Sequence, residues 1–131
     1  MAAAKSDISD LKDIQLLVDH FYQLVQHDEL IGPIFSAAIS DWGPHLQQMY
    51  RFWNAALFGA PGFTGNPFAK HARLPITPQH FKRWLELFSQ TVLNLFEGEK
   101  ATEAIHRANL MAEMFMRRLD SLRNNNRTPI V

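Results

Sequence analysis

The stretch 77–98, TPQHFKRWLELFSQTVLNLFEG, predicts one long amphipathic helix and decides the fold class. Thr77 can cap this helix, and Pro78 suits its first position, where a missing N–H is no loss. Large apolar residues then recur at the spacing that one buried face of a helix requires: Phe81, Trp84, Leu85, Phe88, Val92 and Leu95. The pair Glu97-Gly98 ends the helix.

The same periodicity recurs in three other segments, 13–28, 44–56 and 101–122. Asp13 can cap the first of them, and Ser40 or Asp41 can cap the second. After the pair Gly32-Pro33, which breaks regular structure, we expect a short helical or turning connector over 34–39. No segment shows the alternation of a strand, so the sequence predicts an all-α fold with four main helices.

The region between Gly59 and Pro78 interrupts this pattern with three Gly and four Pro in twenty residues. We expect a long ordered loop there, with one helical turn near 68–72, and long loops inside compact domains are commonly functional. Residues 1–131 have the length of a single domain. The ends 1–9 and 123–131 are expected to be flexible tails.

Composition excludes several functional classes. The chain has no Cys, which removes thiolate nucleophiles, iron–sulfur clusters, Cys-type zinc sites and covalently attached haem. Thirteen Lys and Arg balance thirteen Asp and Glu without a basic stripe, so nucleic acid is not an expected partner. No run approaches the roughly 20 apolar residues of a membrane helix, so we expect no membrane partner and a cytoplasmic protein.

Large side chains are numerous for so short a chain, with ten Phe, three Trp, two Tyr, five Met and six His. They can fill a core or line a cavity around a flat apolar cofactor, and composition leaves both interpretations open. Without Cys, any metal or cofactor must be held by His, Asp, Glu or Met. The spacing of His and Glu matches no zinc or di-iron motif of a helix.

His71 lies in the mainly irregular segment 67–73, among apolar and basic neighbours. A neutral imidazole there is a good axial ligand for iron. Phe68 could then pack against a porphyrin, while Lys70 or Arg73 meets its anionic propionates. A surface histidine of a loop is the alternative interpretation.

Three further side chains carry polar atoms on apolar helix faces. His45 heads the apolar stripe of the second main helix, where it is either a gate beside an iron-bound ligand or a core histidine. The hydroxyl of Tyr22 needs a partner if buried, which could be bound dioxygen or a backbone acceptor. The indole N–H of Trp84 also needs a partner if buried, so Trp84 is either a donor to a bound ligand or a core residue. Met111 carries no such polar atom and is interpreted as core.

Taken in order, these residues resemble the truncated haemoglobins, specifically the third group of that family. The resemblance covers about residues 10–122. The first two groups of the family carry Gly-Gly turns, and this chain, like the third group, contains no Gly-Gly pair. It rests on Phe21-Tyr22, Gly32-Pro33-Ile34-Phe35, His45 eight residues before Trp53, Gly65-Asn66-Pro67 leading into Lys70-His71, Leu74-Pro75, Phe81, and Trp84-Leu85-Glu86-Leu87-Phe88.

The resemblance implies a truncated globin, a two-over-two helical sandwich that holds haem b, with His71 as the iron ligand. On the opposite side of the haem it implies Tyr22 and Trp84 as donors to a bound ligand and His45 as a mobile gate. It also implies a set of residues packed around the haem: Phe35, Met49, Phe52, Trp53 and Phe88.

The expected function is binding of dioxygen or another diatomic ligand at iron, as in oxygen-binding and oxygen-transport globins, with a redox or ligand-detoxifying role. A reductase is a candidate partner. Two alternatives stay open: a haem-free helical module that binds a partner protein, and a haem peroxidase or an enzyme of nitric oxide turnover.

Overall fold

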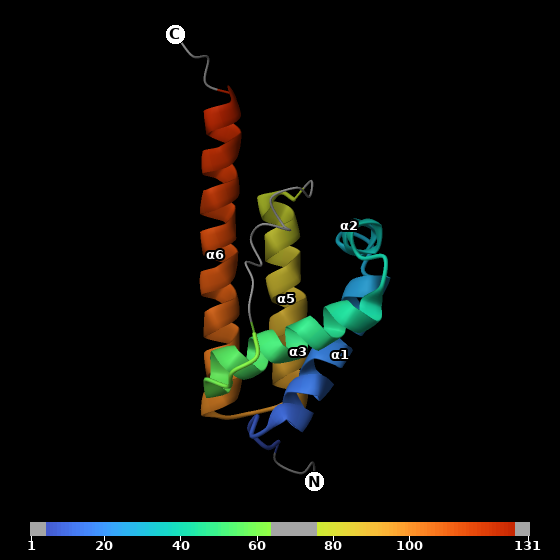
Figure 1. Ribbon diagram of the computed structural model, residues 1–131, viewed down its shortest axis with the longest axis vertical. Coiled ribbons are helices and arrows are strands. Elements are labelled where there is room, and N and C mark those ends of the chain that lie inside the picture. Colours follow the sequence, from blue (N-terminus) through green and yellow to red (C-terminus); the bar gives the residue numbers. More distant parts are fainter. Residues whose placement is uncertain (1–4, 64–75, 128–131) are drawn as a thin grey trace.

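The computed structural model describes residues 5–63 and 76–127, with side chains described to residue 121. All secondary structure in these ranges is helical, which confirms the predicted all-α class. The helices are α1 (Leu11–His27), α2 (Gly32–Ala38), α3 (Trp42–Phe58), α5 (Pro78–Leu95) and α6 (Glu99–Arg127) (Figure 1). The four longer helices match the four that the periodicity predicts.

The helices pack as two pairs. Helix α1 packs against α3, and α5 packs against α6, while α1 also contacts α5 between the pairs. Figure 1 shows α5 and α6 side by side, with α3 and α1 crossing them. This arrangement is the expected two-over-two sandwich, and it leaves the short α2 beside one end of α1.

The helix starts follow from side-chain caps, with one correction to the prediction. Helix α1 is capped by Asp10, whose carboxylate accepts from the Asp13 N–H at 3.1 Å. Asp13, the expected cap, lies in the first turn and accepts from the Ser9 N–H at 2.9 Å instead. Helix α3 is capped by Asp41 rather than Ser40, since the Asp41 carboxylate accepts from the Gly43 N–H.

The connector between α1 and α3 is helical and begins with the pair that was expected to break regular structure. Pro33 lies in the first turn of α2, where its lack of an N–H costs nothing. A Cβ atom on Gly32 would lie 2.9 Å from the carbonyl oxygen of Val25. Glycine at this position therefore lets α2 start directly against the end of α1.

The segment before α1 differs from the flexible tail expected over 1–9. Within its described part, Ile8 is buried, and the Ser6 carbonyl accepts from the Glu97 N–H at 3.1 Å. The carboxylate of Asp7 accepts from the N–H groups of Lys100 and Ala101, both at 2.9 Å. Because the first N–H groups of a helix lack partners within it, Asp7 acts as a cap of α6 from a distant part of the chain.

Gly98 makes this cap possible. Its φ of 145° is a conformation that other residues rarely adopt, and a Cβ atom there would lie 2.5 Å from the Asp7 carboxyl carbon. At the other end of α6 the helix continues to Arg127, past the expected end near residue 122. Once a helix is nucleated, each added residue gains a backbone hydrogen bond, and Asn lowers this gain only modestly.

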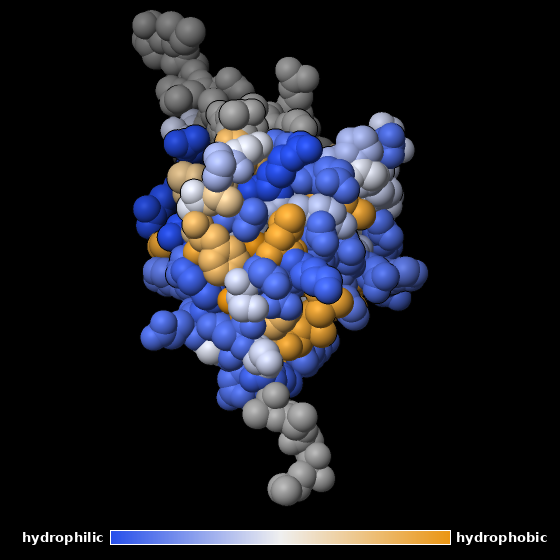
Figure 2. Space-filling model, turned by 60° about the horizontal axis from the view of Figure 1, so that its bottom comes forward, coloured by the Kyte–Doolittle hydropathy of each residue, from blue (hydrophilic) through white to orange (hydrophobic). Residues whose placement is uncertain are grey.

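The buried side chains form two clusters. The larger one lies among α1, α3, α5 and α6. The smaller one, between α5 and α6, contains Ile76, Phe81, Ala112, Phe115 and Leu119. Figure 2 shows apolar side chains on the surface gathered into separate patches among polar ones. None of the described helices has the length and apolar character needed to cross a membrane.

Candidate functional site

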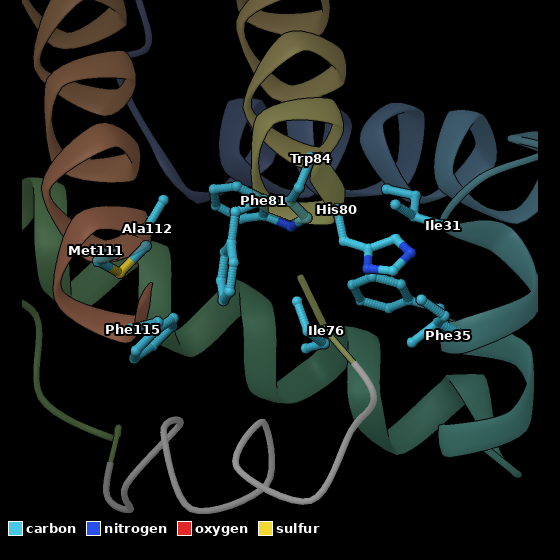
Figure 3. Close-up of a pocket in the computed structure, with 10 residues that line it drawn as sticks. Ile31, Phe35, Ile76, His80, Phe81, Trp84, Met111, Ala112 and Phe115 are labelled. Atoms are coloured by element: carbon cyan, nitrogen blue, oxygen red, sulfur yellow. The ribbon is translucent and has the colours of Figure 1, made fainter. Parts of the chain in front are cut away.

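A pocket opens between α2, α5 and α6 (Figure 3). About 440 Å³ of space lies between its walls, and this figure includes space that is open to solvent. Its walls are apolar or aromatic except for the two nitrogen-bearing rings of His80 and Trp84. The lining residues are Ile31, Ile34, Phe35, Ile76, His80, Phe81, Trp84, Met111, Ala112 and Phe115.

Trp84 is held in the pocket wall by other aromatic rings. Its indole stacks on Phe88 with ring centroids 5.6 Å apart and an interplanar angle of 7°. Phe88 stacks in turn on the buried Trp53, at 4.8 Å and 16°. We call Trp53, Phe88 and Trp84 the aromatic stack. It connects α3 and α5 through the core and presents its last ring to the pocket.

Tyr22 lies in a second group of rings, beside the first. Its phenol ring meets His45 edge to face at 5.0 Å, and it also contacts Trp42 and the pocket-lining Phe35. Tyr22 and Trp84 both contact the ring of Phe21, with centroids at 4.9 and 5.6 Å. The structure therefore brings together Tyr22, His45 and Trp84, the three side chains expected to face a bound ligand.

Burial determines the charge state of the Tyr22 side chain. The residue is only 6% exposed, and this burial raises the pKa of Tyr22 well above the ordinary value of a phenol. The hydroxyl therefore keeps its proton at any physiological pH and is available as a hydrogen-bond donor.

The other residues expected around the cofactor fall into three groups: one that lines the pocket, others that lie in or against the core, and the rest outside the described residues. Phe35 lines the pocket. Trp53 and Phe88 are buried in the core behind Trp84, and Met49 and Phe52 are half-buried against the same core. None of these four is among the described residues that line the pocket, so their contact with a cofactor stays a prediction. His71, Phe68, Lys70 and Arg73 lie outside the described residues.

Several pocket residues were not singled out from the sequence. Phe81 belongs to a predicted buried stripe, and Met111 was assigned to the core by the same criterion. Helical periodicity marks a side chain as facing inward but cannot say whether it meets a neighbour or a cavity. Ile31, Ile34, Ile76, Ala112 and Phe115 carry no chemical signal of their own.

His80 is the one polar residue of this missed set that had a detectable signal. Its Nδ1 accepts from the Thr77 N–H at 2.9 Å, which closes a reciprocal cap at the start of α5. Glu or Gln is the usual residue at this position, three after a Ser or Thr cap. Histidine in that place suggests that the ring serves both the cap and the pocket wall.

Comparisons with known proteins agree with this geometry. A family model described as bacterial-like globin matches residues 7–117. Group 3 truncated hemoglobin ctb of Campylobacter jejuni subsp. jejuni serotype O:2 is 32% identical over an alignment of 120 residues that covers 88% of this chain and 94% of that protein. The crystal structure of group III truncated hemoglobin from Campylobacter jejuni aligns with a TM-score of 0.81 and 30% identity, covering 88% of this chain and 94% of that chain.

The two-over-two arrangement and its match to a solved structure define a globin by class. The chain belongs to the bacterial-like globin family. The resemblance to the group III truncated haemoglobins that the sequence motifs indicate is thereby confirmed.

Proposed function

We propose that this globin-type haem protein holds b-type haem in the pocket between α2, α5 and α6 and binds a diatomic ligand, dioxygen above all, beside Tyr22 and Trp84. The observation that carries the proposal is that Tyr22 and Trp84 both contact the ring of Phe21, while Trp84 lines the apolar pocket and Tyr22 contacts Phe35 of its wall. A pocket for an uncharged apolar ligand would have no need of two such donors.

The residues present fit a porphyrin. A flat apolar ring system suits walls made of Phe35, Phe81 and Phe115. We assign His71 as the iron ligand, Phe68 as a packing residue, and Lys70 and Arg73 as partners of the propionates. When bound, haem would supply an iron centre that takes a diatomic ligand, and His71 would hold that iron.

Tyr22 and Trp84 act as hydrogen-bond donors to that ligand. The raised pKa of Tyr22 keeps a proton on its hydroxyl, and the Trp84 indole nitrogen can only donate. A hydrogen bond to an acceptor carrying negative charge contributes about 1.5–3 kcal/mol, which slows ligand release about tenfold or more for each donor. Slow release suits ligand capture or redox turnover with a reductase better than oxygen delivery.

His45 is assigned as the gate. Its half-buried imidazole lies edge to face against both Tyr22 and Trp42, at 5.0 and 5.7 Å. A ring held by contacts with other rings can rotate away without breaking a helix, and this rotation would open a path to Tyr22 from solvent.

The first experiment records absorption spectra of the purified protein in its ferric, ferrous and carbon monoxide forms. We expect a Soret band that is lost in His71→Ala. A colourless protein that ignores added hemin would reject haem binding and favour a haem-free module that binds a partner. Peroxide turnover above that of free hemin would instead support the peroxidase alternative.

The second experiment measures oxygen dissociation by stopped flow. Tyr22→Phe and Trp84→Phe should each speed release about tenfold or more. Tyr50→Phe is the matched control, because the Tyr50 hydroxyl donates a hydrogen bond to the Asp19 carboxylate on α1 and Tyr50 is not among the described residues that line the pocket. Rates that are equal in all three variants would remove Tyr22 and Trp84 from their assigned roles.

A further inference from the structure

Asp28 is a buried carboxylate at the corner between α1 and α2, with a side chain only 4% exposed. Its Oδ2 accepts from the N–H groups of Leu30 and Ile31 at 3.1 and 3.0 Å, and its carbonyl oxygen accepts from the Gly32 N–H at 3.0 Å. One residue therefore fixes the chain from the end of α1 to the start of α2. That start carries Ile31 into the pocket wall.

The second carboxylate oxygen of Asp28 reaches another wall of the pocket. Its Oδ1 accepts from Nε of Arg83 at 2.7 Å. Arg83 belongs to α5 and directly precedes Trp84 in the chain. Arg83 also pairs with Glu86, and Glu103 pairs with Lys100 and Arg107. Each of these pairs joins residues three or four apart on one helix, whereas the pair of Asp28 and Arg83 joins the end of α1 to α5.

This pair is charged in the folded protein. Burial alone would favour the neutral acid, but hydrogen bonds from Ile31 and Arg83 and the positive charge of Arg83 outweigh it and lower the pKa of Asp28. A buried carboxylate that is ionised must keep its partners. The bond from Asp28 to Arg83 is thus a fixed constraint on the pocket end of α5.

Figure 3 shows what this constraint spans: Ile31 and Phe35 lie on one side of the pocket, and His80, Phe81 and Trp84 come from α5. We propose that Asp28 and Arg83 are positioning residues, whose ion pair sets the placement of the Trp84 indole relative to the α2 wall. The effect on ligand release rests on the proposed function, while the effect on Trp84 itself does not.

The test of placement uses fluorine NMR of the protein labelled with 5-fluorotryptophan. The chain has three Trp, so the Trp84 signal is assigned by its loss in Trp84→Phe. Arg83→Leu should shift or broaden the Trp84 signal and leave those of Trp42 and Trp53 in place. Arg83→Lys keeps the cation and should move the signal less.

Arg107→Leu is the matched control, because Arg107 is also a half-exposed arginine in an ion pair, with Glu103 at 2.8 Å on α6. It should leave all three Trp signals unchanged. If Arg83→Leu does not fold, Asp28→Asn combined with Arg83→Leu removes both charges and should give the same shift of Trp84. An unchanged Trp84 signal in a folded Arg83→Leu protein would overturn the proposal.

The test of function measures oxygen dissociation from the haem-loaded protein. Arg83→Leu should speed release roughly 2- to 30-fold, the usual range for residues that act through another. In the background of Trp84→Phe the same substitution should add nothing, because its effect passes through Trp84. Additive rates would overturn this part of the proposal. If the protein binds no haem, the proposed function fails alone and the NMR result still decides the placement of Trp84.

Discussion

The rings of Trp53 and Phe88 stack at 4.8 Å with an interplanar angle of 16°, and Phe88 extends this contact to Trp84 on the pocket wall. On the side that faces the core, the Trp84 indole is therefore held by the same rings that fill the space between α3 and α5. The Asp28–Arg83 pair acts on α5 from the other side, where α1 meets α2.

The first prediction concerns Phe88, which is 1% exposed. Phe88→Ala should lower the free energy of unfolding by about 3–5 kcal/mol, because it removes the central ring of the aromatic stack and leaves a cavity. Leu93→Ala on the same helix is the control: Leu93 is 58% exposed and should cost about 0.5 kcal/mol or less. Urea denaturation measures both, and similar losses would contradict the packing described here.

The second prediction separates backbone strain from crowding. Gly98→Ala combines a φ of 145° with a clash against Asp7, and should cost about 1–3 kcal/mol for strain plus a further 0.5–2 kcal/mol for the displaced cap. Gly62 has a φ of 114° but no atom of the described residues within 4 Å of its Cβ position, so Gly62→Ala should show the strain alone. Equal melting temperatures for the two variants would show that Asp7 does not act as a cap.

The third prediction is the pH dependence of that cap. Burial works against ionisation of Asp7, but the N–H groups of Lys100, Ala101 and Ile8 outweigh it and lower the pKa of Asp7 below 3.8. A lowered pKa in the folded state means that Asp7 stabilises the protein above pH 3.8 and loses this effect as the pH falls further.

Urea unfolding measured between about pH 2 and pH 7 checks this behaviour. The range is centred near the pKa of about 4 that an Asp side chain has in an unstructured peptide. The stability difference between the wild-type protein and Asp7→Asn should be constant near neutrality and shrink at the acid end. Asp120→Asn, at an exposed position on α6, should show no such difference. A difference for Asp7→Asn that persists unchanged at low pH would argue against an ionised cap.

The fourth prediction uses the two tyrosines of the chain. Burial, followed by the hydrogen bond to Asp19, raises the pKa of Tyr50 to about 12, and burial also raises the pKa of Tyr22. In an alkaline titration followed by ultraviolet absorbance, the folded protein should show no phenolate near pH 10, where model tyrosines ionise. The urea-unfolded chain should titrate there.

The pH dependence of the folding stability follows from the same two pKa shifts. Because the folded state holds these protons more tightly, both tyrosines favour folding below pH 10.0 and lose that effect as the pH rises through 12 and beyond. A phenolate signal near pH 10 from the folded protein, lost in Tyr50→Phe, would show that the bond to Asp19 is absent in solution.

Local rules explain why so much of the fold could be predicted. The stripe from Phe81 to Leu95 and the cap at Thr77 depend only on neighbours in the sequence, and the structure confirms both. Asp10 was missed as the cap of α1 because Asp13 lies one turn further along and is equally suited by residue type. Sequence alone does not distinguish two such candidates.

The site was harder to predict than the helices, because it depends on contacts between distant residues. Nothing in the sequence around Asp28 or Arg83 indicates that these two residues, 55 positions apart, form an ion pair in the folded protein. The signal at His80 is its place three residues after the Thr77 cap, and only the structure shows that its ring both bonds to Thr77 and lines the pocket. Tyr22 and Trp84 both contact the ring of Phe21, and their role as donors to a ligand, which the resemblance to a family implies, stays a prediction.

The cap that Asp7 provides also bears on biosynthesis. Its two backbone partners, Lys100 and Ala101, are translated 93 and 94 residues later, so the nascent chain emerges from the ribosome with this carboxylate and the adjoining Ile8 unmatched. Asp7 and Ile8 therefore reach these native neighbours only after the start of α6 has been synthesised. For this globin, the contact that fixes the start of α6 has to wait for more than ninety residues of intervening chain.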